Sequence, residues 1–135
     1  MVAAPVPAGD GLSARQRDRI EHAVQQAERA SGLSYAVWVG TTDDDLRAHA
    51  ERLHASSGPD AATTVLVAVD PARRGLEIVT GSVAHRALDD RSCGLAALTM
   101  ASCFNGGDLV GGIVQGLASL ADHARHPQTL HLDQP

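Results

Sequence analysis

The amino-acid sequence predicts a single α/β domain, an α/β/α sandwich whose small mixed sheet of about three to four strands has helices on both faces. The chain of 135 residues has the length of one ordinary domain. Segments with helical spacing alternate with short runs of β-branched residues. One run, TTVLVAVD at 63–70, is apolar on both faces, as is typical of a central covered strand. We expect the domain at 12–124, a flexible lead-in at 1–11 and a flexible tail at 125–135.

The predicted core consists of small and aliphatic side chains. Hydrophobic residues make up 44% of the chain, yet the aromatic residues are Tyr35, Trp38 and Phe104 alone. The core must therefore be built from Ala, Val, Leu and Ile, and small side chains allow backbones to approach closely.

The first predicted helix lies in LSARQRDRIEHAVQQAERASG, residues 12–32. Ser13, with Gln16 three positions later, forms a capping box, and Gly32 is placed to end the helix. The residues at helical spacing are Ile20, Ala23, Val24 and Ala27. The β-branched and aromatic run YAVWVG, residues 35–40, then predicts a strand that ends at a glycine.

A second helix is expected next, followed by two strands. Three aspartates at 43–45 crowd its first turn, where the positive end of the helix dipole favours acids. Its predicted buried stripe is Leu46, His49, Ala50 and Leu53. After the central strand at 63–70, PARRG supplies a turn and LEIVTG, residues 76–81, gives an antiparallel partner. Because a helix joins the first two strands, that pair should be parallel.

The C-terminal third predicts a short helix at 82–88 and two longer helices. Either Asp89 or Asp90 can cap the helix that runs to Phe104, and Asp108 can cap the last helix. The earlier of these is apolar almost all round, through Leu95, Leu98, Met100, Ala101 and Phe104. It should therefore sit between the sheet and another element. The residues of the last helix expected to face inward are Leu109, Ile113, Leu117 and Leu120.

The glycine-rich stretch GGDLVGGIVQG, residues 106–116, raises the question of phosphate binding. Gly107 and Gly112 have the spacing of a phosphate loop, but Ile113 and Val114 stand where Lys and Ser or Thr are needed. The stretch also follows a helix, whereas the dinucleotide pattern follows a strand. We therefore expect no nucleotide binding. The glycines are interpreted as structural, letting chains turn or pack closely: Gly81, Gly106, Gly107, Gly112 and Gly116.

The charge, the apolar stretches and the first residues of the sequence bear on its partners and its location. The net charge is -5, from 16 acids and 11 arginines, with no basic run, so nucleic acid is not an expected partner. No apolar stretch is long enough for a membrane span, and the first residues lack the features of a secretory signal. A cytoplasmic location is the resulting expectation.

Cys93 and Cys103, ten residues apart on one helix, would lie roughly 15 Å apart and form no disulfide.

Several of these segments together resemble the TPM domain family. The resemblance is carried by LEIVTG, then Leu88 with Asp90, then Phe104, Gly107-Asp108, Gly112-Ile113 and Gly116-Leu117. The first helix and YAVWVG are similar to the N-terminal part of that family. The family includes thylakoid-lumen proteins linked to photosystem repair and membrane-anchored bacterial homologues. The chain most resembles its short, soluble, uncharacterised actinobacterial branch, and the lysine-free composition, rich in Ala and Arg, is compatible with such a source.

The resemblance implies an α/β/α sandwich and, for some members, acid phosphatase activity or calcium binding; other members are assembly or repair factors. This chain departs from the family pattern after Gly81, where Ser82, Val83, Ala84 and His85 replace an aromatic, a glycine and an acid. PDAATT, residues 59–64, replaces the family's asparagine-glycine turn.

A divalent-cation site for Ca or Mg is one hypothesis for the acidic residues. Asp90 and Asp108 match the family pattern and are the best candidate ligands, with Asp89 as a third, and each of them also has a capping explanation. The aspartates at 43–45 also fall at the end of an element. No His or Cys pair has zinc-site spacing, Cys103 lies on an apolar helix, and Ser82 lacks a nucleophile elbow.

Two functions of different classes remain, and a third is weaker. The first is a non-catalytic protein-binding or assembly module with an unknown protein partner. The second is a metal-dependent phosphatase acting on phosphomonoesters, in which clustered aspartates hold the ion that activates water. The third is an anion sensor at the helix N-terminus near Gly107, although Asp108 would repel the anion.

Overall fold

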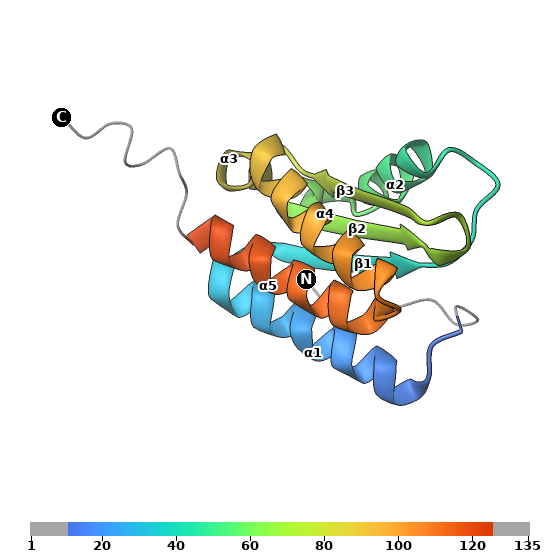
Figure 1. Ribbon diagram of the computed structural model, residues 1–135. Helices are drawn as coiled ribbons and strands as arrows, with labels where there is room; N and C mark the ends of the chain where they lie inside the picture. Colours follow the sequence, from blue (N-terminus) through green and yellow to red (C-terminus); the bar gives the residue numbers. More distant parts are fainter. Residues whose placement is uncertain (1–10, 126–135) are drawn as a thin grey trace.

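A computed structural model describes residues 11–125 and shows a three-stranded sheet with helices on both faces (Figure 1). The strands are β1 (Ser34–Val39), β2 (Thr64–Asp70) and β3 (Gly75–Thr80), in the order β1-β2-β3. β1 pairs parallel with β2, and β2 pairs antiparallel with β3. The predicted α/β class and mixed sheet are thereby confirmed. Apart from Gly11 and Arg125, the predicted lead-in and tail lie outside the described residues.

Five α-helices surround the sheet within the described part of the chain. They are α1 (Ala14–Ser31), α2 (Leu46–Ala55), α3 (Ala84–Ala87), α4 (Asp90–Asn105) and α5 (Leu109–Arg125). Two short 3-10 helices, η1 (Gly58–Thr63) and η2 (Pro71–Arg73), flank β2. None of the helices within residues 11–125 combines the length and hydrophobicity that a membrane span needs.

Alternation along the strands divides the buried residues into two layers. Side chains at odd positions of β1 and β2, such as Val37 and Val67, pack with α1, α4 and α5. Side chains at even positions, such as Ala36 and Leu66, pack with Ala50 of α2 on the other face. All seven residues of β2 are buried, because the strand has a neighbour on each side and helices above and below it. This is the covered central strand that the apolar run predicts.

Local signals place the first two helices. The amide of Gln16 donates to Ser13 Oγ at 3.1 Å and the amide of Ser13 donates to Gln16 Oε1 at 2.8 Å, which forms a capping box at the start of α1. α2 begins later than the cluster of acids suggests. None of the three aspartates at 43–45 lies in its first turn, because the helix starts at Leu46; Asp45 is the N-cap and accepts from the Ala48 amide at 3.0 Å.

The expectation that the helix ending near Phe104 is covered on both sides is wrong for its outer face. α4 packs against α5 and β3 through Ser92, Ala96 and Met100, which are buried. Leu98 is 70% exposed and Leu95 is 44% exposed. The physical reason is that α4 lies in the outer layer, so the side facing away from the sheet meets solvent (Figure 1).

Two glycines of α5, Gly112 and Gly116, lie against α4. A Cβ at Gly112 would lie 2.6 Å from Phe104 Cε1, and one at Gly116 would meet the side chain of Met100. A Cβ at Gly81 would meet the backbone carbonyl of Ala61. These positions therefore allow chains to approach closely.

Candidate functional site

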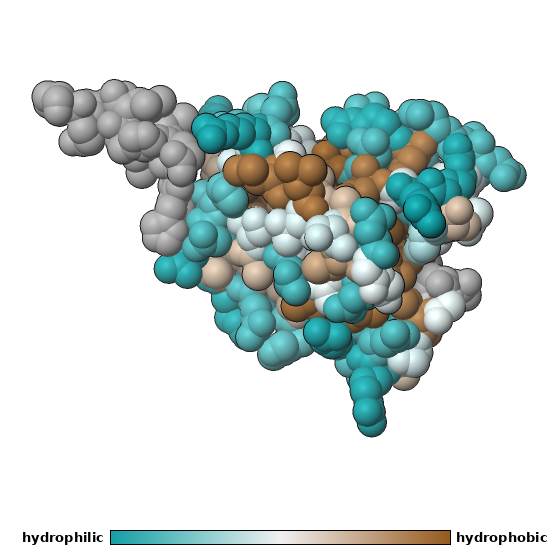
Figure 2. Space-filling model, in the orientation of Figure 1, coloured by the Kyte–Doolittle hydropathy of each residue, from teal (hydrophilic) through white to brown (hydrophobic). Residues whose placement is uncertain are grey.

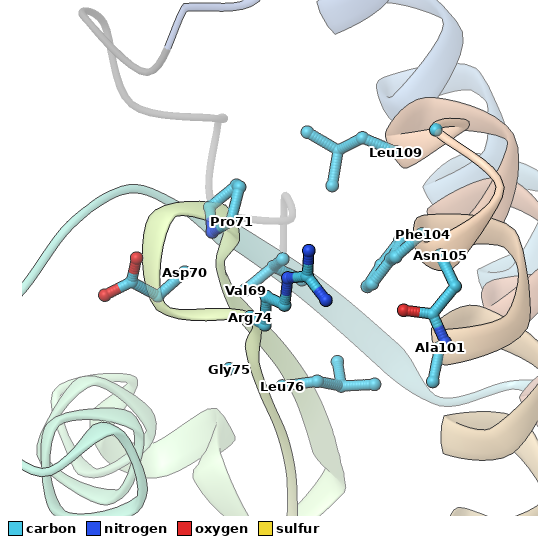
Figure 3. A pocket seen from close by; sticks show the side chains of 11 residues that line it. Val69, Asp70, Pro71, Arg74, Gly75, Leu76, Ala101, Phe104, Asn105 and Leu109 are labelled. Carbon is cyan, nitrogen blue, oxygen red and sulfur yellow. The ribbon is translucent and has the colours of Figure 1, made fainter.

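A cleft of about 270 Å³ opens between the β2–β3 turn and the α4–α5 turn (Figure 3). Its first wall consists of Val69, Asp70, Pro71, Arg74, Gly75 and Leu76. Its second wall consists of Ala101, Phe104, Asn105, Gly107 and Leu109. The two walls come from segments about thirty residues apart, so the cleft exists only in the folded chain.

The first wall is held in place by the buried carboxylate of Asp70, which ends β2. Asp70 is 1% exposed and accepts hydrogen bonds from the amides of Thr42 and Arg73, each at 3.3 Å. These two bonds tie the η2 turn to the loop after β1. The buried carboxylate stabilises the turn, since each of its two oxygens accepts a hydrogen bond from an amide.

The two arginines of this turn have different environments. Arg73 Nη1 donates to the carbonyl oxygens of Thr42 at 2.6 Å and Asp44 at 2.9 Å, so its guanidinium fastens one loop to another. Arg74 has φ 54 and ψ 36 in the left-handed region. Its guanidinium is directed toward the space between Phe104 and Leu109, while the Asp70 carboxylate points to the other side of the turn (Figure 3). No described residue forms a hydrogen bond or an ion pair with that guanidinium.

The second wall is built by the end of α4 and the start of α5. The amide of Gly111 donates to Asp108 Oδ1 at 2.9 Å, so the Asp108 carboxylate sits at the N-terminus of α5. Gly107, with φ 85, makes the turn between the two helices. Phe104 and Leu109 are half-buried and leave an apolar surface toward the cleft.

A second feature is the outer face of α4, where Leu95 and Leu98 are exposed. Figure 2 shows hydrophobic side chains gathered over the N-terminal half of this helix. Gly94 lies beside them with open space where a Cβ would be. We call Gly94, Leu95 and Leu98 the α4 leucine face.

The structure separates the acids that the sequence offers as metal ligands. Asp89 is the N-cap of α4 and Asp90 is its first residue, whereas Asp108 follows the other end of the same 16-residue helix. At about 1.5 Å per residue the helix alone places them roughly 24 Å apart. Within residues 11–125, no three acidic, histidine or cysteine side chains converge as metal ligands would. The described residues thus do not bring Asp89, Asp90 and Asp108 into one site for Ca or Mg.

Comparison with models of protein families shows to which family this chain belongs. Residues 6–121 match the model of a domain of unknown function, DUF5130. The chain belongs to the DUF5130 family. A search of curated proteins found no match.

Solved structures share the fold of this DUF5130 domain. BA42 protein from Bizionia argentinensis superposes with a TM-score of 0.77 at 17% identity, over 87% of this chain and 84% of that one. An N-terminal domain from P. gingivalis gives 0.74 at 19% identity, over 87% and 80%. The N-terminal domain of cg2496 protein from Corynebacterium glutamicum gives 0.73 at 14% identity, over 87% and 76%. At these identities the likeness shows the fold.

Two titratable groups of the DUF5130 domain have shifted pKa values near the start of α4. The amide of Ser92 donates to Asp89 Oδ1 at 2.9 Å, and this bond to the charged carboxylate lowers the pKa of Asp89. Burial, followed by the nearby charges of Asp90 and Asp89, raises the pKa of Cys93 to about 11. Both cysteines are free thiols on α4. A thiol whose pKa is raised in this way is a poor nucleophile at neutral pH.

The sequence patterns do not indicate that Arg74 and Asn105 line the cleft in this DUF5130 domain. PARRG predicts a turn, but a turn sequence does not reveal which of two adjacent arginines faces a cavity. The available signal was the doubled arginine in a turn, since one guanidinium is enough to hold the loop. Asn105 had no local signal, because its place depends on where α4 ends.

Proposed function

We propose that this DUF5130 domain is a non-catalytic protein-binding module that docks a partner on the α4 leucine face. The observation that carries the proposal is the 70% exposure of Leu98. Isolated exposed leucines are common on protein surfaces. Here a second exposed leucine, Leu95, lies one turn earlier on the same helix, and Gly94 lets another chain approach the backbone.

Burial energetics favour this face as the centre of an interface. Burying a leucine side chain stabilises a complex by about 1.5–3 kcal/mol relative to leaving it in water, and most of the Leu98 surface is still exposed. Asp90 and Arg91, on the turn of α4 that precedes Gly94 and Leu95, are exposed and charged. An apolar centre with a polar rim is the common arrangement of protein interfaces. We therefore infer a partner with a matching apolar surface.

The resemblance to the TPM family supports the same proposal, because it implies assembly or repair roles for some members. The phosphatase alternative loses support, since its best ligands, Asp90 and Asp108, lie at opposite ends of α4. Metal-dependent turnover of a generic phosphate ester, abolished in both Asp90→Asn and Asp108→Asn, would reverse this preference.

The test is capture of partners from cells of the source organism with the full chain and two charge variants. Leu98→Glu adds an acid to the leucine face, and Gln115→Glu adds the same charge on the exposed side of α5 as the matched control. We expect a set of proteins bound by the native chain and by Gln115→Glu but lost with Leu98→Glu. Circular dichroism should show all three folded, because both positions are exposed.

Capture of the same proteins by all three chains, or of none by the native chain after cross-linking, would contradict the proposal. A partner identified in this way should then protect the amides around Leu98 from hydrogen exchange, which places the interface on α4 independently of the variant.

A further inference from the structure

We propose that the cleft between the β2–β3 turn and the α4–α5 turn binds a small organic anion, with its carboxylate or phosphate group paired to Arg74 and a short apolar body against Phe104 and Leu109 (Figure 3). This site is separate from the α4 leucine face and does not depend on the function proposed for it.

The first argument is the charge of the Arg74 guanidinium. Arg73 already supplies the guanidinium that fastens the turn, through two carbonyl oxygens. Arg74 is thus not needed for that contact, and within the described residues no acceptor engages its side chain. A guanidinium directed into a cleft offers a planar pair of donors that matches a carboxylate or a phosphate.

The second argument is the backbone conformation of Arg74. It is the only non-glycine residue of the described chain with a positive φ, at 54°. A side chain in the left-handed region costs roughly 1 kcal/mol or more relative to glycine or asparagine there. The next residue, Gly75, has Leu46 Cδ2 2.7 Å from where its Cβ would be. A glycine therefore stands at position 75, where space is short, whereas an arginine stands at position 74, where the backbone conformation is strained.

The third argument is the chemistry of the walls. Leu76, Phe104 and Leu109 give apolar surface, and Asn105 adds an exposed amide group that can donate or accept. The volume of about 270 Å³ is slightly below the usual range for drug-sized ligands, which indicates a small molecule.

Two acids near the cleft are already engaged. The Asp70 carboxylate accepts from the amides of Thr42 and Arg73 and points away from the Arg74 guanidinium. The Asp108 carboxylate accepts from the Gly111 amide. Their charges oppose an anion, so the direct pair with Arg74 must provide the attraction.

The test is a titration of the full, isotope-labelled chain followed by amide NMR shifts. The probes are 3-phenylpropionate, 3-phenylpropyl phosphate and the neutral 3-phenylpropan-1-ol, which share an apolar body and differ in the headgroup. We expect both or one of the anions to shift the amides of Arg74, Gly75, Asn105 and Leu109, and to bind at least about tenfold more tightly than the alcohol. The stronger of the two anions identifies the headgroup.

Variants separate recognition from folding. Arg74→Asn removes the charge and suits the left-handed conformation, so it should stay folded while its affinity for the anion falls by about tenfold or more. Arg86→Asn removes an exposed charge from α3, whose residues do not line the cleft, and should leave the affinity unchanged. Three outcomes would overturn the proposal. They are equal affinity for the alcohol and the anions, unchanged affinity in Arg74→Asn, and no shift at the cleft amides with about 10 mM probe, which is roughly the weakest binding of interest.

Discussion

Gly116 of α5 lies directly against the side chain of Met100 of α4. Met100 is fully buried, and an added Cβ at position 116 would meet its Cγ and Sδ atoms, with Cε 2.8 Å away. The absence of a side chain at Gly116 therefore sets how closely α4 and α5 pack. Because α4 ends at the cleft and carries the leucine face, this contact also positions both candidate surfaces.

Gly116→Ala should destabilise the domain by about 1–2 kcal/mol. Overpacking a core costs about 1–3 kcal/mol, and the better helix propensity of alanine offsets up to about 1 kcal/mol of that. Urea denaturation measures the difference. In a double-mutant cycle, Met100→Ala should cost less in the Gly116→Ala background than in the native chain, since it makes room for the new methyl group.

Gly94→Ala is the matched control on the neighbouring helix. It is a mid-helix glycine with nothing within 4 Å of the added Cβ, so alanine should stabilise by about 0.5–1 kcal/mol. Opposite signs at the two positions support close packing as the role of Gly116. A loss of stability at both positions would point to a general intolerance of substitutions in these helices.

The sequence was sufficient for the sheet and for the helix ends that depend on neighbouring residues. Ser13 and Gln16 form their capping box without help from distant residues, and the apolar run of β2 predicts a covered strand because no other position in a sheet suits it. Burial of Ile113, Leu117 and Leu120 followed from helical spacing alone. These features arise from chain segments shorter than about twenty residues.

The candidate sites were harder to predict, because each depends on where separate elements meet. Asp90 and Asp108 are close in sequence, but a straight helix between them keeps their carboxylates apart. Leu98 belongs to an apolar helix, and spacing does not reveal that its side of α4 lacks a neighbour. Arg74 faces a cleft whose other wall begins at Ala101, a relation that no local pattern contains.

Gly81→Ala should destabilise by about 3 kcal/mol or more, the upper end of what overpacking costs. Its Cβ would meet the backbone carbonyls of Ala61 and Ala62, which cannot rotate away as a flexible side chain does. The Gly81 amide also donates to the Thr64 carbonyl at 3.0 Å, so the chain cannot shift without losing that bond. Thermal and urea unfolding measure the change in the free energy of unfolding. A loss of stability below about 1 kcal/mol, the effect of an average substitution, would show that η1 adjusts easily.

Cys93 should react slowly with iodoacetamide in the folded domain. Its pKa of about 11, against an ordinary value of 9.0, reduces the thiolate fraction near pH 8 by roughly a hundredfold. Mass spectrometry of the native and urea-unfolded chains, with Cys103→Ser as the background, should show faster labelling by about that factor on unfolding. Equal rates in the two states would mean that burial does not suppress the thiolate.

Asp89 should make the stability of the domain depend on pH in the acid range. The Ser92 amide stabilises the charged carboxylate and lowers the pKa of Asp89 below its ordinary value of 3.8. The folded state therefore binds this proton less readily than the unfolded state. The stabilising contribution is fully present above pH 3.8 and is lost as the pH falls through the lowered pKa.

Carbon-detected NMR should show that the Asp89 carboxyl group titrates below pH 3.8. Asp89→Ser keeps an N-cap acceptor but removes the charge, so its stability relative to the native chain should improve as the pH is lowered through this range. A stability difference between the two chains that is independent of pH would show that the hydrogen bond to Ser92 does not favour the charged form.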